Sequence, residues 1–263
     1  MKNLKILVLW LGIAGYLTFA LGFVSDKVNN QVCERIIINI TSSLTNRFIS
    51  EVDVVDILVE SEDSILGYPL SDINIGKLEN LLAGEPFIKS AQLYRTANGR
   101  LCGEILQRNP VLRIINQQGQ SYYLDASGHI LPVSEKFTSR VLVANGYISE
   151  PFVAESSKSI FDVEIPPDKR DQVIYDLLSL ASFIKSSDLW NAQITQIYVN
   201  NKYEYELIPR VGAHIIELGG AVDYEKKFRK LEALYSYGFN NKGWNNYEKI
   251  DLKYENQIVC TKR

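Results

Sequence analysis

The longest apolar segment of the chain lies at its N-terminus. Residues 6–24 carry no charge and are almost wholly apolar, and Lys2 and Lys5 precede them. A helix of that length reaches roughly 28 Å, close to the hydrocarbon thickness of a bilayer. Lysines before a span bias the N-terminus toward the cytoplasm. The pattern therefore predicts a short cytoplasmic tail at residues 1–5, a single transmembrane helix at residues 6–24 and an exported remainder.

A cleaved signal peptide is the rival interpretation of this segment. The start is basic, and Ala20-Leu21-Gly22 offers small residues at the spacing of a cleavage site. The apolar part of a signal peptide normally stops after ~7 to 15 residues, whereas this one runs further, which favours an uncleaved anchor. Cleavage would leave a secreted or periplasmic binding protein.

The pattern after the apolar segment predicts one strand and then two helices. Ile36-Ile37-Ile38 is a short β-branched run, typical of a strand. Ser50 and Asn74 each stand before apolar positions at helical spacing and are candidate helix caps. Gly84 and Pro86 end the second helix.

Two further strands complete this region. Residues 91–95 and 101–107 flank Asn98-Gly99, a strong hairpin signal because both turn positions favour positive φ. Residues 25–110 are therefore predicted to form one domain in the order strand, helix, helix, strand, strand.

From Val111 onward the pattern changes to repeated short strands separated by turns that contain glycine. Two amphipathic helices interrupt them, one capped by Asp168 and one starting near Asp223. Residues 111–263 are predicted to be a mainly antiparallel β domain with helices on one face, and the fold class is α+β. The predicted strands are residues 111–116, 121–125, 129–133, 140–144, 194–199, 203–208, 214–218, 247–254 and 257–261.

Composition and motifs exclude several function classes. A net charge of −3 and a pI near 5.6 provide no basic surface for nucleic acid. The two histidines, His129 and His214, each stand alone in a predicted strand. No P-loop, nucleophile elbow or metal-binding motif occurs, so no catalytic residue, metal or cofactor is expected. A glycan hydrolase with dispersed carboxylates remains an alternative.

The three cysteines, Cys33, Cys102 and Cys260, are too few for a disulfide scaffold. In an oxidising compartment one bridge could form, and Cys33 with Cys102 is the candidate pair because both fall in the first domain. Three free, buried thiols are the alternative.

Several motifs, in this order and spacing, resemble those of a known family. They are Glu85–Ala91 before a strand of the first domain, Gln107–Ile114 at the junction, Tyr122–Leu131 with its Y-x-hydrophobic-D-x-x-G pattern, and Ile250–Tyr254 near the end. Together with the N-terminal anchor, they resemble the FtsQ/DivIB family of bacterial cell-division proteins. Residues 255–257 depart from the family, which usually has glycine after the terminal tyrosine.

The resemblance implies a POTRA domain followed by a β domain in a non-enzymatic, bitopic scaffold of the divisome. Such a protein lies in the bacterial cytoplasmic (inner) membrane with its C-terminal bulk in the periplasm or extracytoplasmic space, and it recruits and regulates other division proteins. The implied partners are of the FtsB and FtsL type, with FtsK-type proteins and septal peptidoglycan synthase components as further candidates. A POTRA-containing outer-membrane assembly factor is a weaker alternative, because POTRA repeats and barrel strands are absent from the sequence.

The resemblance places much of the partner contact on the last strands. A terminal edge strand leaves unpaired N–H and C=O groups to which a partner strand can add. Tyr254 is the leading anchor, because tyrosine is enriched at interface hot spots. Alternatively, Tyr254 faces the core, as we expect for Ile250 and Leu252. The candidate contact residues are Tyr254, Gln257, Ile258, Val259 and Thr261.

Arg108 and Arg113 flank Pro110 at the predicted domain junction. They are either hinge or interface residues that fix the angle between the domains, or solvated strand positions whose charge keeps an edge from aggregating. Pro110 marks the place where a strand of the first domain stops.

Overall fold

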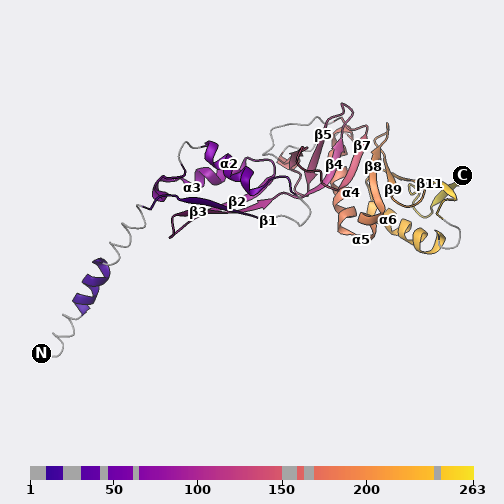
Figure 1. Cartoon of the computed structure of the whole chain (residues 1–263). Helices are drawn as coiled ribbons and strands as arrows, with labels where there is room; N and C mark the ends of the chain where they lie inside the picture. The colour runs from indigo at the N-terminus through magenta and orange to yellow at the C-terminus, as the bar shows by residue number, and fades with distance from the viewer. Residues whose placement is uncertain are drawn as a thin grey trace. The chain divides into compact units, whose positions relative to one another are not determined.

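A computed structural model describes residues 10–19, 31–41, 47–61, 65–149, 159–162, 169–239 and 244–263 of the chain. The chain divides into two compact units, shown in Figure 1. Unit 1 comprises Met1–Thr41 and Ile49–Gln107, and unit 2 comprises Ser42–Phe48 and Arg108–Arg263.

Residues 10–19, inside the predicted membrane span, are helical (Figure 1). The rest of that span, at residues 6–9 and 20–24, lies outside the described residues, as do the predicted tail at residues 1–5 and the cap Asp168. Among the residues that are described, no helix combines the length and the apolar character needed to cross a membrane.

Unit 1 is a three-stranded sheet with two helices. Its strands lie in the order β1-β3-β2, with β1 parallel and β2 antiparallel to the central β3. The elements are β1 (Arg35–Thr41), α2 (Glu51–Ser61), a 3-10 turn (Leu70–Asp72), α3 (Ile75–Ala83), β2 (Ile88–Thr96) and β3 (Arg100–Gln107). The predicted order of strand, helix, helix, strand, strand is confirmed.

The ends of these elements follow from their local chemistry. Ser50 Oγ accepts a hydrogen bond from the Asp53 N–H at 3.3 Å, and Asp53 Oδ2 accepts one from the Ser50 N–H at 2.9 Å, which makes a capping box for α2. Asn74 Oδ1 accepts from the Lys77 N–H at 3.1 Å and caps α3. Gly99, between β2 and β3, has a φ of 77°, which explains the glycine in this turn.

Unit 2 is built on a nine-stranded sheet in the order β12-β11-β10-β9-β8-β7-β4-β5-β6. Its strands are β4 (Pro110–Ile115), β5 (Ser121–Asp125), β6 (Ile130–Pro132), β7 (Leu142–Gly146), β8 (Ile194–Val199), β9 (Tyr205–Pro209), β10 (Ile215–Gly219), β11 (Tyr247–Asp251) and β12 (Val259–Lys262). Its helical segments are a 3-10 turn (Ile160–Asp162), α4 (Lys169–Ser186), α5 (Asp188–Gln193), α6 (Tyr224–Ala233) and a π-helical turn (Leu234–Gly238).

The sheet is mixed: five of its eight strand pairs are antiparallel, in line with the predicted mainly antiparallel arrangement, and three are parallel, which the sequence did not predict. Strand β7 runs parallel to both β4 and β8, and β10 runs parallel to β11. Helices α4 and α5 connect β7 to β8, and α6 connects β10 to β11. A helix between two strands returns the chain to the starting end of the sheet and makes the pair parallel. Turn signals in the sequence report only hairpins between consecutive strands.

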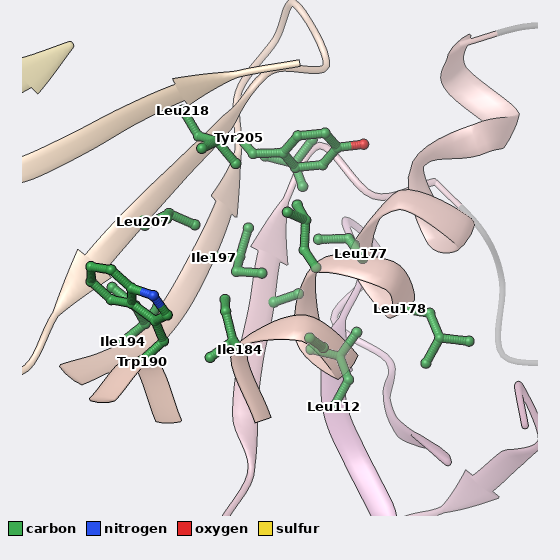
Figure 2. Packing of buried hydrophobic residues seen from close by; sticks show 14 of the residues in the cluster. Leu112, Leu177, Leu178, Ile184, Trp190, Ile194, Ile197, Tyr205, Leu207 and Leu218 are labelled. Atoms are coloured by element: carbon green, nitrogen blue, oxygen red, sulfur yellow. The ribbon is translucent and has the colours of Figure 1, made fainter. Parts of the chain in front are cut away.

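One hydrophobic core joins the helices of unit 2 to its sheet. Figure 2 shows side chains of α4 and α5 gathered with those of β4, β8, β9 and β10. The apolar residues of α4 at helical spacing are all buried: Val173, Ile174, Leu177, Leu178, Ala181 and Ile184. Helix α5, which the sequence did not predict, contributes Trp190, which is 3 % exposed.

A smaller aromatic cluster covers Tyr123 of β5. The Phe48 ring lies 5.6 Å from the Tyr123 ring and 5.1 Å from the Phe137 ring, both in edge-to-face contact. Tyr122, the preceding residue, packs into the main core instead, and both tyrosines are buried. Successive side chains of a strand point to opposite faces, so the two tyrosines serve two different cores.

Candidate functional site

Strand β12 occupies one end of the nine-stranded sheet. It pairs with β11 in antiparallel register, with Asp251 opposite Val259, Ile250 opposite Cys260 and Lys249 opposite Thr261. Within the part of the chain that the structure describes, no strand pairs with its other side. An edge of this kind presents unpaired backbone groups to which an added strand can bond.

The predicted contact residues divide between the two faces of this edge. Val259 is 41 % exposed, and Gln257 and Thr261 are also exposed. Ile258 and Cys260 are half-buried and pack against the core of unit 2. The structure therefore presents Val259 and Thr261 on one face and uses Ile258 to fix the strand to the core.

The backbone direction of β12 follows from the residue after it, Arg263. The Arg263 N–H donates a hydrogen bond to the Asn246 carbonyl oxygen at 3.2 Å, so it points toward the β11 side. Successive residues of a strand direct their N–H and C=O groups to opposite sides. Lys262 and Cys260 therefore direct theirs toward the open edge.

Tyr254 does not lie in a strand. The predicted strand 247–254 ends at Asp251 in the structure, and Tyr254 follows in a bend, with 49 % of its surface exposed. Ile250 and Leu252 are fully buried, as predicted. The core-facing alternative for Tyr254 is therefore wrong.

The connection between β11 and β12 is held from two directions. The Lys253 N–H donates to Asp251 Oδ1 at 2.8 Å, a side-chain turn that ends β11. From α6, the Lys230 ammonium group donates to the carbonyl oxygens of Leu252 at 3.3 Å and Tyr254 at 2.5 Å. These bonds fix the backbone that carries the exposed tyrosine.

A charged cluster ties β10 to β11 and to the segment after it. Glu217 of β10 accepts hydrogen bonds from Lys249 at 3.0 Å and from Lys253 at 3.1 Å, and Lys253 also lies 3.5 Å from Asp251. The hydrogen bond from Lys249, followed by the interactions with Lys253, lowers the pKa of Glu217. This cluster supports the two strands on which β12 rests.

Aromatic packing supports the core side of the same strands. His214 Nε2 and the Tyr235 hydroxyl group lie 2.9 Å apart, and both residues are buried. Burial lowers the pKa of His214. The Tyr235 ring also contacts Trp244 at 4.9 Å and Phe239 at 5.3 Å between ring centroids. The sequence pattern predicts His214 only as a lone residue of a strand and contains no signal for this hydrogen bond.

The two arginines at the predicted domain junction, Arg108 and Arg113, differ in burial and in their partners. Arg108 is 8 % exposed, and its Nη1 donates to Asp125 Oδ2 at 3.0 Å, so the solvated alternative is wrong for Arg108. Arg113 is half-buried, donates to Ser121 Oγ at 2.9 Å and lies 5.5 Å above the Tyr123 ring. Pro110 is buried.

Pro110 begins β4 of unit 2, whereas the last strand of unit 1 ends at Gln107. Its carbonyl oxygen accepts a hydrogen bond from Lys185 at 2.9 Å. Asp125, the partner of Arg108, was not singled out from the sequence, although it is the aspartate of the Y-x-hydrophobic-D-x-x-G pattern noted above.

The three cysteines are free, and the candidate pair Cys33 and Cys102 is not joined. Cys102 lies in β3 opposite Ile37 of β1 and Tyr94 of β2, so its position is fixed by two neighbouring strands. Among the described residues, no group of histidine, cysteine or acidic side chains is arranged to hold a metal ion.

Comparison with known families decides where this architecture belongs. A family model described as FtsQ/DivIB, C-terminal related, matches residues 109–261, which is more than half of the chain. The chain belongs to the FtsQ/DivIB family. A model of the POTRA-like domain matches residues 31–106, in agreement with the β-α-α-β-β order of unit 1.

The FtsQ/DivIB family comprises non-catalytic scaffolds of bacterial cell division that are, in general, anchored in the membrane. Family membership suggests a cell-division scaffold that interacts with other proteins of the divisome. No curated protein sequence matches this chain.

Proposed function

We propose that this FtsQ/DivIB-family chain is a non-enzymatic, single-pass scaffold of the divisome that captures a partner segment by adding a strand to β12. The observation that carries the proposal is that, among the described residues, no strand pairs with the outer side of β12. Val259 and Thr261 are exposed on this strand, and Tyr254 is exposed in the connection that precedes it.

Strand addition divides affinity and specificity between backbone and side chains. Main-chain hydrogen bonds to Cys260 and Lys262 would supply affinity, since their backbone groups face the open edge. Alternate side chains such as Val259 and Thr261 would supply specificity. Tyr254 offers a large amphipathic ring held on a fixed backbone, the type of residue that is enriched at hot spots.

The proposed partners are small coiled-coil membrane proteins of the FtsB and FtsL type. FtsK-type proteins and components of the septal peptidoglycan synthase are further partners, and the POTRA unit would offer a second docking surface. Family membership and the apolar, uncharged residues 6–24 support a location in the bacterial cytoplasmic membrane. In that topology the N-terminus lies in the cytoplasm and the bulk of the chain outside it.

Co-purification of FtsB/FtsL-type proteins with the full chain tests the strand addition. Deletion of Gln257–Arg263 should abolish recovery of the partner. A sharper test is Lys262→Pro, which removes an outward-facing N–H, and its matched control Lys262→Ala, which removes the side chain but keeps that N–H. Partner recovery should fall with the proline variant and persist with the alanine variant. Equal recovery of the partner with the wild type, both variants and the deletion would contradict the strand-addition proposal.

Two measurements test the remainder of the proposal. The purified full chain should neither cleave nor polymerise peptidoglycan, and such activity would contradict a non-enzymatic role. N-terminal sequencing of the membrane fraction should find the chain starting at or near Met1. A chain that starts after Gly22 would replace the anchor with a cleaved signal peptide.

A further inference from the structure

A pocket of unit 2 lies away from the β12 edge. It has a volume of about 310 Å³ and is formed where β4 and β7 begin and where α4 ends. Pro110, Val111, Leu142 and Ala181 supply apolar lining. Its polar lining includes Arg140, Lys185 and the amide side chain of Asn191.

The charged side chains that line this pocket are all cationic. Arg140 and Lys185 both line it, and none of the described residues that line it carries a carboxylate. Neither cation forms an ion pair with any described acidic residue. By contrast, Lys226, Lys249, Lys253 and Arg108 of the same unit all have a carboxylate within 4.0 Å.

The hydrogen-bond partner of Lys185 in the pocket is a neutral backbone carbonyl group. The Lys185 ammonium group donates a hydrogen bond to the Pro110 carbonyl oxygen at 2.9 Å, which uses one of its three N–H donors. Burial lowers the pKa of Lys185, and no nearby negative charge compensates. Part of the Lys185 side chain remains exposed to water, and a bound anion would replace that water as the partner of its charge.

We propose that this pocket binds an oxyanion carried on a small organic group, with Arg140 and Lys185 as its cationic contacts. The planar guanidinium group of Arg140 suits a carboxylate or phosphate in a two-point interaction, and the ammonium group of Lys185 adds a point charge. The Asn191 amide adds a neutral hydrogen-bonding group. The apolar lining from Val111, Leu142 and Ala181 favours an anion attached to carbon over a bare inorganic ion.

The shared ligand chemistry is an oxyanion at the end of a short organic chain, either a carboxylate or a phosphate monoester. Saturation-transfer NMR on the full chain in a non-ionic detergent tests it with three probes. They are N-acetylalanine, which carries a free carboxylate, its neutral amide, and methyl phosphate. We expect N-acetylalanine to bind and the amide not to bind. Displacement of N-acetylalanine by methyl phosphate at lower concentration would assign the pocket to phosphate monoesters, and failure to displace it would assign the pocket to carboxylates.

Charge-removal variants locate the binding. Arg140→Gln and Lys185→Gln should each weaken N-acetylalanine binding by at least about tenfold, the effect of losing one charge-assisted contact. The control Lys226→Gln removes an exposed lysine of α6 outside the pocket and should leave binding unchanged. Arg140 makes no hydrogen bond to another described residue and is exposed, so Arg140→Gln remains informative if the Lys185 variant unfolds. Equal binding of the acid and the amide, no binding of either anion, or unchanged binding in Arg140→Gln would overturn the proposal.

Discussion

The Arg108 guanidinium group and the Asp125 carboxylate form a buried ion pair, with Nη1 3.0 Å from Oδ2 and side-chain exposures of 10 % and 6 %. The other carboxylate oxygen accepts hydrogen bonds from the Ser127 N–H at 2.8 Å and the His129 N–H at 2.9 Å. Asp125 therefore joins the segment that enters unit 2 to the turn after β5. The pair fixes the first strand of unit 2 rather than lying in solvent.

Replacing Arg108 should destabilise unit 2. Arg108→Met removes the counter-charge and leaves the Asp125 carboxylate buried with only backbone donors. The expected loss is about 3 kcal/mol of unfolding free energy, which lowers the thermal midpoint by roughly 6 to 12 °C for a unit of this size. Circular dichroism melting of the full chain measures it. Arg113→Met, at a half-buried site, should cost about 1 kcal/mol, and an equal shift in both variants would contradict the special role of Arg108.

Local signals in the sequence were sufficient to predict unit 1. The capping residues Ser50 and Asn74, the Asn98-Gly99 turn and the β-branched run Ile36-Ile37-Ile38 each specify an element by chemistry within a few residues. The structure places the caps, the strand and the turn where these signals predict them, but of the two turn positions only Gly99 has a positive φ, so Asn98 does not adopt the predicted conformation.

Contacts between residues far apart in the sequence could not be predicted from such local signals. The parallel pairing of β7 with β4 and β8 joins strands far apart in the sequence, and no turn signal encodes it. Helix α5 is only six residues long and carries no complete apolar period. At the site, alternation predicted the burial of Ile250 and Leu252, but the end of β11 at Asp251 depends on a side-chain turn and on Lys230 from α6. The Arg140 and Lys185 pocket likewise arises only when α4 packs on the sheet.

The stability of unit 2 should depend on pH through His214. Burial holds the pKa of His214 below its ordinary value of 6.5. The unfolded chain therefore binds a proton at higher pH than the folded chain does. The stabilisation is fully present above about pH 6.5 and is lost as the pH falls through the lowered pKa, at up to about 1.4 kcal/mol per pH unit.

Thermal melts followed by tryptophan fluorescence between pH 7.5 and 5 measure this dependence, because Trp190 and Trp244 both contact the Tyr235 ring that bonds to His214. His214→Gln keeps a hydrogen-bonding group near Tyr235 but does not titrate. It should flatten the profile in this range, even if its midpoint at pH 7.5 is lower. A variant slope identical to that of the wild type would show that another group is responsible.

Removing Lys230 should loosen the segment between β11 and β12 without unfolding the unit. Lys230→Met deletes the ammonium group that bonds to the Leu252 and Tyr254 carbonyl oxygens but keeps an unbranched side chain on α6. Loss of about 1.4 kcal/mol of local stabilisation would speed amide exchange in residues 253–257 about tenfold. Hydrogen–deuterium exchange with mass spectrometry reports it. Arg229→Met, at the neighbouring exposed position, should leave exchange in this segment unchanged.

Tyr254 should contribute to partner binding more than to folding. Its ring is 49 % exposed, while its carbonyl oxygen is held by Lys230, so Tyr254→Ala removes the ring and keeps the backbone contact. We expect unfolding free energy to change by less than about 0.5 kcal/mol. Affinity for an FtsB/FtsL-type partner should fall at least about tenfold, as for a truncated hot-spot residue. Tyr237→Ala provides the matched control, since Tyr237 is 80 % exposed on the π-helical turn of the same unit. Affinities measured by titration of the partner into full chain should separate the two variants, and equal losses in both would indicate general adhesion of exposed tyrosines instead of a contact at the β12 edge.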